Sequence, residues 1–347
     1  MKSFFKRSVI SIVVLGMAGS SYAAMSHMSN SNNAGWAPRF TGFFIGVDGL
    51  DLRAQNGDLD YITYSPNFTP GSFSTSAVST SYQWNWRIYG GIKFTDNDDI
   101  TVSWMSLKNN NSDSVVIPSG TTTALRWLDQ QATWSSASAS ADFTLNDGYL
   151  VWGHTVNFNN PWSVRYAAGV EYVKLDADLD VTGASSSSTV ILAYEGDSHT
   201  QGWGPRVEFD ATYHLPYNFA LFANTNAALL ASTRKISLDA ALDTNTTTTP
   251  NIFSSYFDTR HVIIPRLGMR LGASYSLVWG QAGGEGASCS ALTLDVGWQA
   301  DAFIHAIERP EDGYINSTTT SVMAETKTSN FTDQGWFIGL KFSSDWL

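Results

Sequence analysis

Apolar and polar residues alternate one by one along several segments that are long for strands of soluble proteins. In residues 82–94, one face carries Tyr82, Trp84 and Trp86, and the other carries polar residues such as Asn85 and Arg87. Because successive side chains of a strand point to opposite faces, this segment predicts a strand with one apolar and one polar face. Soluble strands usually have about 5–6 residues, whereas a tilted transmembrane strand needs about 9–11. The length therefore favours a strand that crosses a membrane.

The same alternation recurs along the whole chain. The segments are 39–53, 82–94, 99–108, 139–156, 162–178, 202–214, 218–232, 260–277, 288–303 and 335–342. Short turns alternate with long polar segments at 54–81, 109–138, 179–201, 233–259 and 304–332. Short periplasmic turns, long extracellular loops and an even number of strands are typical of transmembrane barrels. The sequence therefore predicts an all-β fold, a transmembrane antiparallel up-and-down β-barrel of about ten strands, within a range of 8–12.

A secreted β-sandwich is the main alternative, because its strands alternate as well. A sandwich does not account for strands beyond ten residues, or for one consistently long set of loops. No stretch of 18 apolar residues follows the N-terminal region, so no transmembrane helix is expected.

The N-terminal residues have the pattern of an export signal. Lys2, Lys6 and Arg7 precede a short apolar run at 9–18, and small residues surround Ala23. Such a run is too short for the roughly 20 residues of a spanning helix. We therefore expect a signal peptide at 1–23, a flexible N-terminal segment at 24–38 and a single outer-membrane barrel domain at 39–347. After cleavage the protein would reside in the outer membrane of a Gram-negative bacterium.

Composition excludes several classes of protein. Charged residues make up 15% of the chain, against about 25% in soluble domains, while aromatic residues make up 13%. The net charge of −11 argues against a nucleic-acid partner, which would require basic residues. Cys289 is the single cysteine, which excludes an intramolecular disulfide and a cysteine-based metal site. Neither a metal site nor a cofactor is expected.

Charged residues at mid-strand must face the lumen, because an Arg or Lys that faces lipid at the midplane costs about 2–4 kcal/mol. The predicted pore-lining residues are Asp48, Arg87, Lys93, Arg165, Glu171, Arg206, Glu208, Asp210, Arg266, Arg270, Asp295 and Lys341. Rings of such charges tune ion selectivity. They could instead pair with one another and fill the lumen, since open channels appear at about 16–18 strands. Seven glycines on the same face would widen the lumen and favour conduction: Gly46, Gly91, Gly169, Gly268, Gly272, Gly297 and Gly339.

An enzyme hypothesis rests on two His–Asp pairs at the predicted extracellular rim. Asp197 with His199, or Asp258 with His261, could provide a general base. The sequence offers no convincing second carboxylate pair, and solvated loop residues explain both pairs. We therefore expect no catalytic residues and no enzyme.

Two stretches resemble a known family. The first begins with GFFIGVDGLDLR at 42–53 and GDLDY at 57–61, and continues through YQWNWRIYGGI at 82–92 to DDITVSW at 98–104. The second comprises NDGYL at 146–150, Asn157 with Phe158, and RYAAGVEY at 165–172. Together they resemble the Legionella-type major outer membrane protein family of pore-forming β-barrels. The resemblance implies a porin-like role. Abundant members of that family form disulfide cross-linked complexes. This chain has only Cys289, which allows at most one intermolecular disulfide per chain.

The leading expectation is a porin-like barrel for passive diffusion of ions or small solutes. The alternative is a closed structural or adhesin barrel whose extracellular loops bind host surfaces, and a hydrolase active at the rim is third. Expected partners are outer-membrane lipid and lipopolysaccharide, and the barrel-assembly machinery, which would use Phe342 or the terminal Trp346–Leu347 pair. The sequence leaves a homo-oligomer and host surface molecules open as further partners.

Overall fold

The computed structural model describes residues 41–65, 74–95, 97–118, 122–125, 131–132, 134–158, 161–185, 190–244, 251–280, 289–315 and 322–345. The predicted signal peptide, the N-terminal segment at 24–38 and the terminal Trp346–Leu347 pair lie outside these residues. Among the described residues, no helix has the length and apolarity to cross a membrane.

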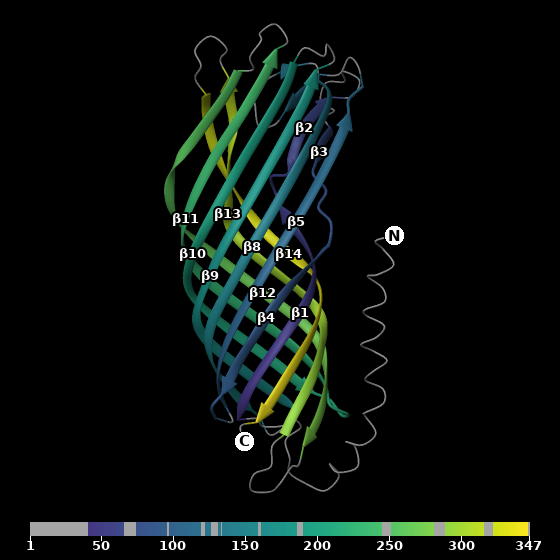
Figure 1. Cartoon of the computed structure of the whole chain (residues 1–347), viewed down its shortest axis with the longest axis vertical. Helices are drawn as coiled ribbons and strands as arrows, with labels where there is room; N and C mark the ends of the chain where they lie inside the picture. The colour runs from purple at the N-terminus through teal and green to yellow at the C-terminus, as the bar shows by residue number, and fades with distance from the viewer. Residues whose placement is uncertain are drawn as a thin grey trace.

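Ten strands form a closed barrel in which every neighbouring pair is antiparallel (Figure 1). In the order of the ring they are β1 (Gly42–Asn56), β14 (Val322–Asp345), β13 (Cys289–Ile315), β12 (Asn251–Gly280), β11 (Phe219–Thr244), β10 (Val190–His214), β9 (Trp162–Ser185), β8 (Trp134–Asn157), β5 (Asp98–Val116) and β4 (Gln83–Lys93). The ring closes where β1 pairs with β14, from Gly42 opposite Asp345 to Asn56 opposite Phe331. The predicted ten-stranded barrel is confirmed.

Most strands extend far into the segments that the sequence analysis treats as loops. β9 ends at Ser185 rather than near residue 178, β10 begins at Val190 rather than at 202, and β12 has 30 residues. A membrane crossing needs only about 9–11 residues of strand. The long extracellular segments therefore contain the second half of the barrel wall.

The alternation reverses its polarity partway along the strands. In β9, the inward residues change from Arg165 and Glu171 to Val173, Leu175 and further apolar side chains. The outward residues change from Tyr166, Val170 and Tyr172 to Lys174 and a run of aspartates. We call the part between the short turns and the cross-strand row of Trp104, Tyr172 and Trp203 the membrane half, and the part beyond this row the outer half.

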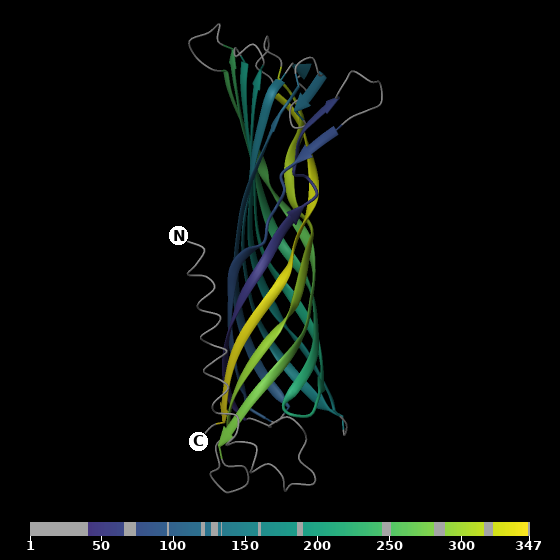
Figure 2. The same cartoon turned by 90° about the vertical axis from the view of Figure 1, so that its right-hand side faces the viewer.

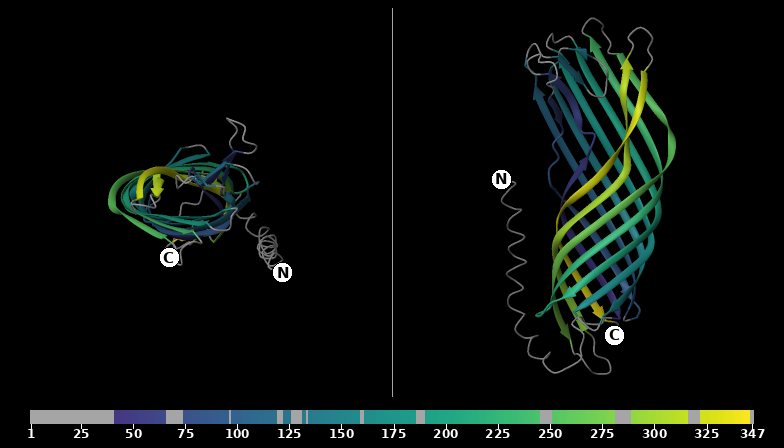
Figure 3. Two further views of the ribbon diagram at one scale, coloured as in Figure 1. Left: turned by 90° about the horizontal axis from the view of Figure 1, so that it is seen from above. Right: turned by 180° about the vertical axis from the view of Figure 1, so that it is seen from behind.

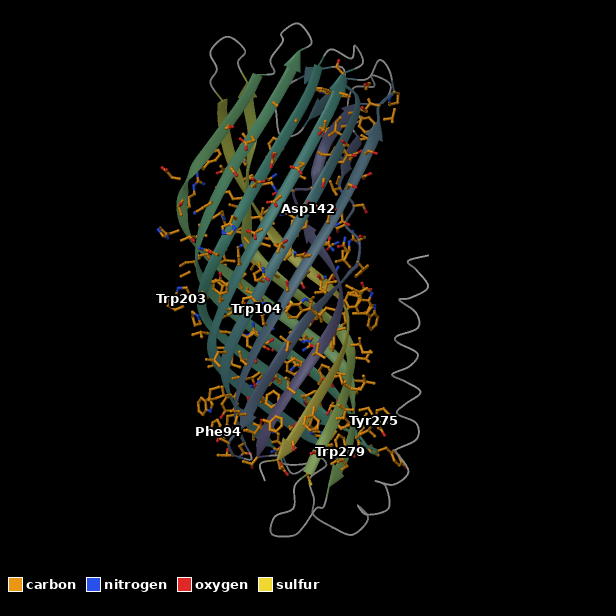
Figure 4. The ribbon with its side chains drawn as sticks, in the orientation of Figure 1. Phe94, Trp104, Asp142, Trp203, Tyr275 and Trp279 are labelled. Carbon is orange, nitrogen blue, oxygen red and sulfur yellow. The ribbon has the colours of Figure 1, made fainter. Side chains whose placement is uncertain are left out.

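The outward apolar side chains of the membrane half form the belt expected for lipid contact. Phe94, Tyr275 and Trp279 lie near the short turns, and Trp104 and Trp203 lie at the other edge of the belt (Figure 4). The side chain of Trp203 is 67% exposed. Beyond this edge the outward face is polar, as on a soluble protein. The outer half therefore stands in the water outside the membrane.

The barrel wall has a seam in the outer half. β4 pairs with β1 only up to Gln83 opposite Leu52, and β1 ends at Asn56. A small antiparallel sheet lies next to this place, in the order β3 (Ser74–Ala77), β2 (Asp60–Ser65), β6 (Thr122–Leu125) and β7 (Gln131–Ala132) (Figure 2). Strands of two to six residues are too short to show alternation, and the sequence pattern does not predict the sheet.

Candidate functional site in the lumen

All twelve predicted pore-lining residues occupy inward-facing positions of their strands. The structure places them together in the membrane half and joins most of them in ion pairs. Many are buried: Asp48 is 1% exposed, Glu171 1% and Arg206 4%. Their position follows from strand parity, and their role in conduction remains a prediction.

The larger ion-pair network is centred on Arg266 of β12. Its guanidinium contacts Glu171 of β9 at 2.5 Å, and Asp147 of β8 and Asp301 of β13 at 2.9 Å each. Glu171 also accepts a hydrogen bond from Arg206 of β10 at 2.7 Å. Because β8 and β9 lie across the ring from β12 and β13, these contacts bridge opposite walls of the barrel.

The network continues toward the short turns through Glu208. Arg206 donates to one carboxylate oxygen of Glu208 at 2.7 Å, and Arg165 donates to the other at 3.3 Å. Arg165 in turn makes two hydrogen bonds to Asp99, at 2.7 and 2.8 Å, and one to Asp210 at 2.9 Å. Charge-assisted and bidentate bonds of this kind are the strongest side-chain hydrogen bonds in proteins. The network therefore holds the lumen side chains in fixed positions.

A second cluster joins β1, β4 and β12. Asp48 of β1 accepts hydrogen bonds from Arg87 of β4 and from Arg270 of β12, the latter at 3.0 Å. The Arg270 guanidinium also lies over the ring of Phe337, 4.0 Å from its centroid. Since β12 lies three places from β1 in the ring, this cluster also crosses the lumen.

Four buried inward aspartates are not among the predicted residues: Asp99, Asp147, Asp301 and Asp333. The twelve predicted residues comprise five acidic and seven basic side chains, which suggests a slightly basic wall. The four aspartates raise the acidic number to nine against seven basic side chains, so these sixteen inward residues together are slightly acidic. Asp301 and Asp295 lie an even number of residues apart on β13, so they face the same side of the strand. The predicted inward position of Asp295 would therefore have identified Asp301 as inward too.

The inward glycines do not widen the lumen as expected, because neighbouring side chains cover them. A Cβ atom on Gly272 would lie 2.6 Å from the ring of Phe222, and one on Gly297 would lie 2.8 Å from the ring of Phe337. These two rings are themselves in contact, with centroids 6.2 Å apart. The glycines therefore make room for large side chains that fill the lumen.

The outer half is closed by an apolar core. The rings of Phe143, Phe303 and Phe331 are 0–1% exposed, and Phe331 lies 5.6 Å from Phe143 and 5.9 Å from Phe303. They are part of one buried cluster with leucines and alanines of β8, β9 and β11. The view from above shows a flattened ring, in keeping with opposite walls that approach each other (Figure 3).

Hydrogen bonds between β10 and β13 confirm that these opposite walls touch. Thr200 donates to the carbonyl of Ala306 at 3.0 Å, and the backbone N–H of Glu308 donates to Ser198 at 3.2 Å. β11 and β12 separate these strands in the ring. β13 reaches β10 by bending at His305, which has a φ of 54° and lies in a break of the register with β14. The outer half therefore resembles a two-layered sandwich.

The two His–Asp pairs of the enzyme hypothesis are not paired in the way it requires. The ring of His199 contacts Asp176 on the neighbouring strand, and Asp197 accepts a hydrogen bond from Ser237 at 3.1 Å. Asp258 and His261 are both exposed on β12. Among the described residues, no group of His, Cys, Asp and Glu has the arrangement of a metal site.

Comparison with known proteins identifies the family of this chain. Residues 37–344 match the family model described as Legionella pneumophila major outer membrane protein precursor. No curated protein matches the chain. Similar solved structures include the outer membrane protease OmpT from Escherichia coli, with 8% identity, a TM-score of 0.44, and 89% of this chain and 100% of that chain covered. The outer membrane protein OprG from Pseudomonas aeruginosa has 9% identity, a TM-score of 0.30, and 89% and 98% covered. The toluene transporter TodX from P. putida has 9% identity, a TM-score of 0.36, and 90% and 91% covered. The chain therefore belongs to the Legionella major outer membrane protein family, and its barrel lies in the outer membrane.

Proposed function

We propose that this protein is an axially closed outer-membrane barrel, which carries a rigid body outside the membrane for contact with other surfaces. The main support for this proposal is the change along strands such as β9, by which the inward face turns from charged to apolar and the outward face from apolar to polar. It puts an apolar core, rather than a water-filled lumen, between the membrane and the outside.

The energetics of the axial path support a closed state. An ion moving along the axis would first pass the ion pairs around Arg266, and then the core around Phe331. Moving a small ion into an apolar medium costs about 20 kcal/mol in the idealised limit, and several kcal/mol after relaxation. The faces of Phe143, Leu175 and Leu179, which are 0–1% exposed, offer this ion only apolar contacts, and the buried Arg234–Glu308 pair of the outer half lies on β11 and β13. Passive diffusion along the axis would therefore be negligible without a large rearrangement.

The length of the strands supports the second part of the proposal. β8 to β14 contain 24 to 30 residues each, about twice what a membrane crossing needs. A core of this kind holds the outer half rigid, so the segments at its far end would be presented well above the lipid. Rigid scaffolds that present surface loops are a common basis of binding.

A porin-like barrel is the second candidate, because part of the lumen is wet. The side chains of Arg165 and Asp210 are 18% exposed and that of Arg270 is 21% exposed, all in the membrane half. Water therefore reaches the lumen from the end of the short turns. Passage would require the outer half to open.

Conductance of the folded protein in planar bilayers tests the proposal. We expect no discrete current steps in concentrated potassium chloride, from protein whose folding is verified by heat-modifiable gel mobility, while a general porin in the same bilayers conducts. Steps in the wild type, with an ion preference that changes in Arg270→Glu but not in the outward-facing control Lys174→Glu, would establish the porin-like function instead. For the second part of the proposal, bacteria that display the barrel should adhere to cultured host cells more than matched bacteria that lack it. Equal adherence would contradict a binding role.

A further inference from the structure

A cavity of about 580 Å³ opens at the seam of the barrel wall, apart from the lumen. We propose that it is a binding site for a saccharide, that is, a hydroxyl-rich ligand of low net charge. Sites for small ligands usually have volumes of about 300–1,000 Å³. The inference goes beyond the proposed function, because the cavity would exist on a conducting barrel as well as on a closed one.

The cavity forms because three elements diverge at the same height. β1 ends at Asn56, the chain after β3 passes back toward the barrel through Val78 and Thr80, and the pairing of β13 with β14 breaks between Phe303 and Ile307. Val78 is tied to Leu59 by a backbone hydrogen bond of 2.9 Å. The walls of the cavity are therefore backbone segments held by the fold.

The chemistry of the lining favours hydroxyl groups as partners. Most side chains around the cavity are amides, hydroxyls and other polar groups, among them Gln55, Asn56, Thr80, Ser329 and Asn330. Neutral amides and hydroxyls both donate and accept hydrogen bonds, as sugar hydroxyls do. A phosphate would need more cations than Arg53 and His305 provide, and the carboxylate of Asp60 lies in the same lining.

Two buried polar groups of the lining lack a partner within the described residues. The hydroxyl of Ser329 and the side-chain nitrogen of Asn56 are buried without a hydrogen bond, and Ser329 as a whole is 9% exposed. An unsatisfied buried polar group costs about 1–3 kcal/mol, so each such group in a native protein calls for an explanation. Both side chains line the cavity, so a hydroxyl-rich ligand becomes their hydrogen-bond partner once the amide or the hydroxyl turns toward it.

The position of the cavity relative to the membrane indicates where such a ligand would come from. Trp336, in the aromatic belt, lies opposite Asp51, and the next two outward pairs are Arg53 with Gln334 and Gln55 with Thr332. The cavity therefore begins just beyond the aromatic edge of the membrane half. Two sources could supply a saccharide there: the sugars of an outer-leaflet lipid, and a free oligosaccharide from outside the cell.

Binding of defined saccharides to the folded barrel in detergent tests the proposal. The probes are purified lipopolysaccharide from the bacterium that makes the protein, the oligosaccharide released from it by mild acid, the remaining lipid A, and an array of free oligosaccharides. Gln55→Leu removes one hydrogen-bonding group from the cavity, and Ser329→Ala removes the unpartnered hydroxyl. Gln334→Leu is the matched control, because Gln334 is the next outward residue on β14 from Thr332 and does not line the cavity.

We expect saccharide binding to weaken about three- to tenfold in Gln55→Leu and in Ser329→Ala, as for the loss of one hydrogen bond, and to stay unchanged in Gln334→Leu. Binding of the released oligosaccharide and of intact lipopolysaccharide would assign a lipid-borne sugar. Binding of array glycans alone would assign a free one. The proposal is wrong if no saccharide binds, if lipid A alone binds and its binding is unchanged in both cavity variants, or if the control variant weakens binding as much as the cavity variants do. Conductance measurements do not enter this test, so its failure is separate from that of the closed-barrel proposal.

Discussion

Removal of the Arg266 guanidinium is the sharpest test of the ion-pair network. The side chain is 4% exposed, and the ion pairs of Asp147 and Asp301 both go to it, whereas Glu171 retains Arg206. Arg266→Leu therefore leaves two buried carboxylates without their cation. Breaking a buried pair from one side costs about 3–5 kcal/mol, and the two losses are not additive, since both pairs share one guanidinium. We expect the free energy of unfolding to fall by about 3–5 kcal/mol.

Urea-induced unfolding in lipid vesicles, followed by tryptophan fluorescence, measures this change. The matched control is Arg260→Leu on the same strand, because Arg260 is 45% exposed and its partner Glu308 keeps a 2.7 Å contact with Arg234. Exposed pairs contribute at most about 1 kcal/mol. The double variant Arg266→Leu with Asp301→Leu should recover part of the loss. A cost below about 1 kcal/mol for Arg266→Leu would refute the view that the network holds the lumen together.

Two further predictions concern the outer half. Phe331→Ala should lower the free energy of unfolding by about 3–5 kcal/mol, because it empties a site that is 0% exposed and packed on Phe143. Val116→Ala, at 83% exposure, should leave it unchanged, and equal effects of the two variants would contradict the apolar core. Burial and the nearby carboxylate of Asp197 raise the pKa of Asp178 to about 6, so the folded protein holds this proton more tightly than the unfolded chain does. Stability should therefore fall as the pH rises from about 4 to about 6, and Asp178→Asn should remove this loss and stabilise the protein at pH 7. An unchanged pH profile in the variant would exclude this origin.

Strand parity accounts for what could be predicted about the site. Once residues 82–94 are aligned by their outward Trp84 and Trp86, Arg87 must point inward, and the structure places it against Asp48. The same reasoning places Arg206 and Arg266 inward. Their partners could not be predicted, because a strand pattern gives the face of a residue but not its neighbour across a lumen.

In the outer half the strands continue where the sequence predicts loops. In β9, Val173, Leu175 and Leu179 alternate with Lys174 and Asp178, so the period of two continues past the predicted end of the strand. Polar outward residues resemble loop composition, and for this reason the sequence predicts loops in the segments beyond the membrane. The outward face changes from apolar to polar because the solvent outside changes from lipid to water. The inward face changes from a network of ion pairs to a core that is mainly apolar, with the Arg234–Glu308 pair buried in it.

The sequence by itself determined the class of the fold, limited the number of strands to about ten within a range of 8–12, and gave the inward face of the twelve predicted pore-lining charges. These features depend only on the two-residue period of a strand and on the cost of a charge in lipid. The tertiary structure decided whether the lumen is open. Closure depends on the flattening of the ring, which brings Phe303 and Phe331 together and lets β13 reach β10. It also decided where β1 leaves the wall, and hence the cavity, because contacts across the barrel join residues that no local pattern connects.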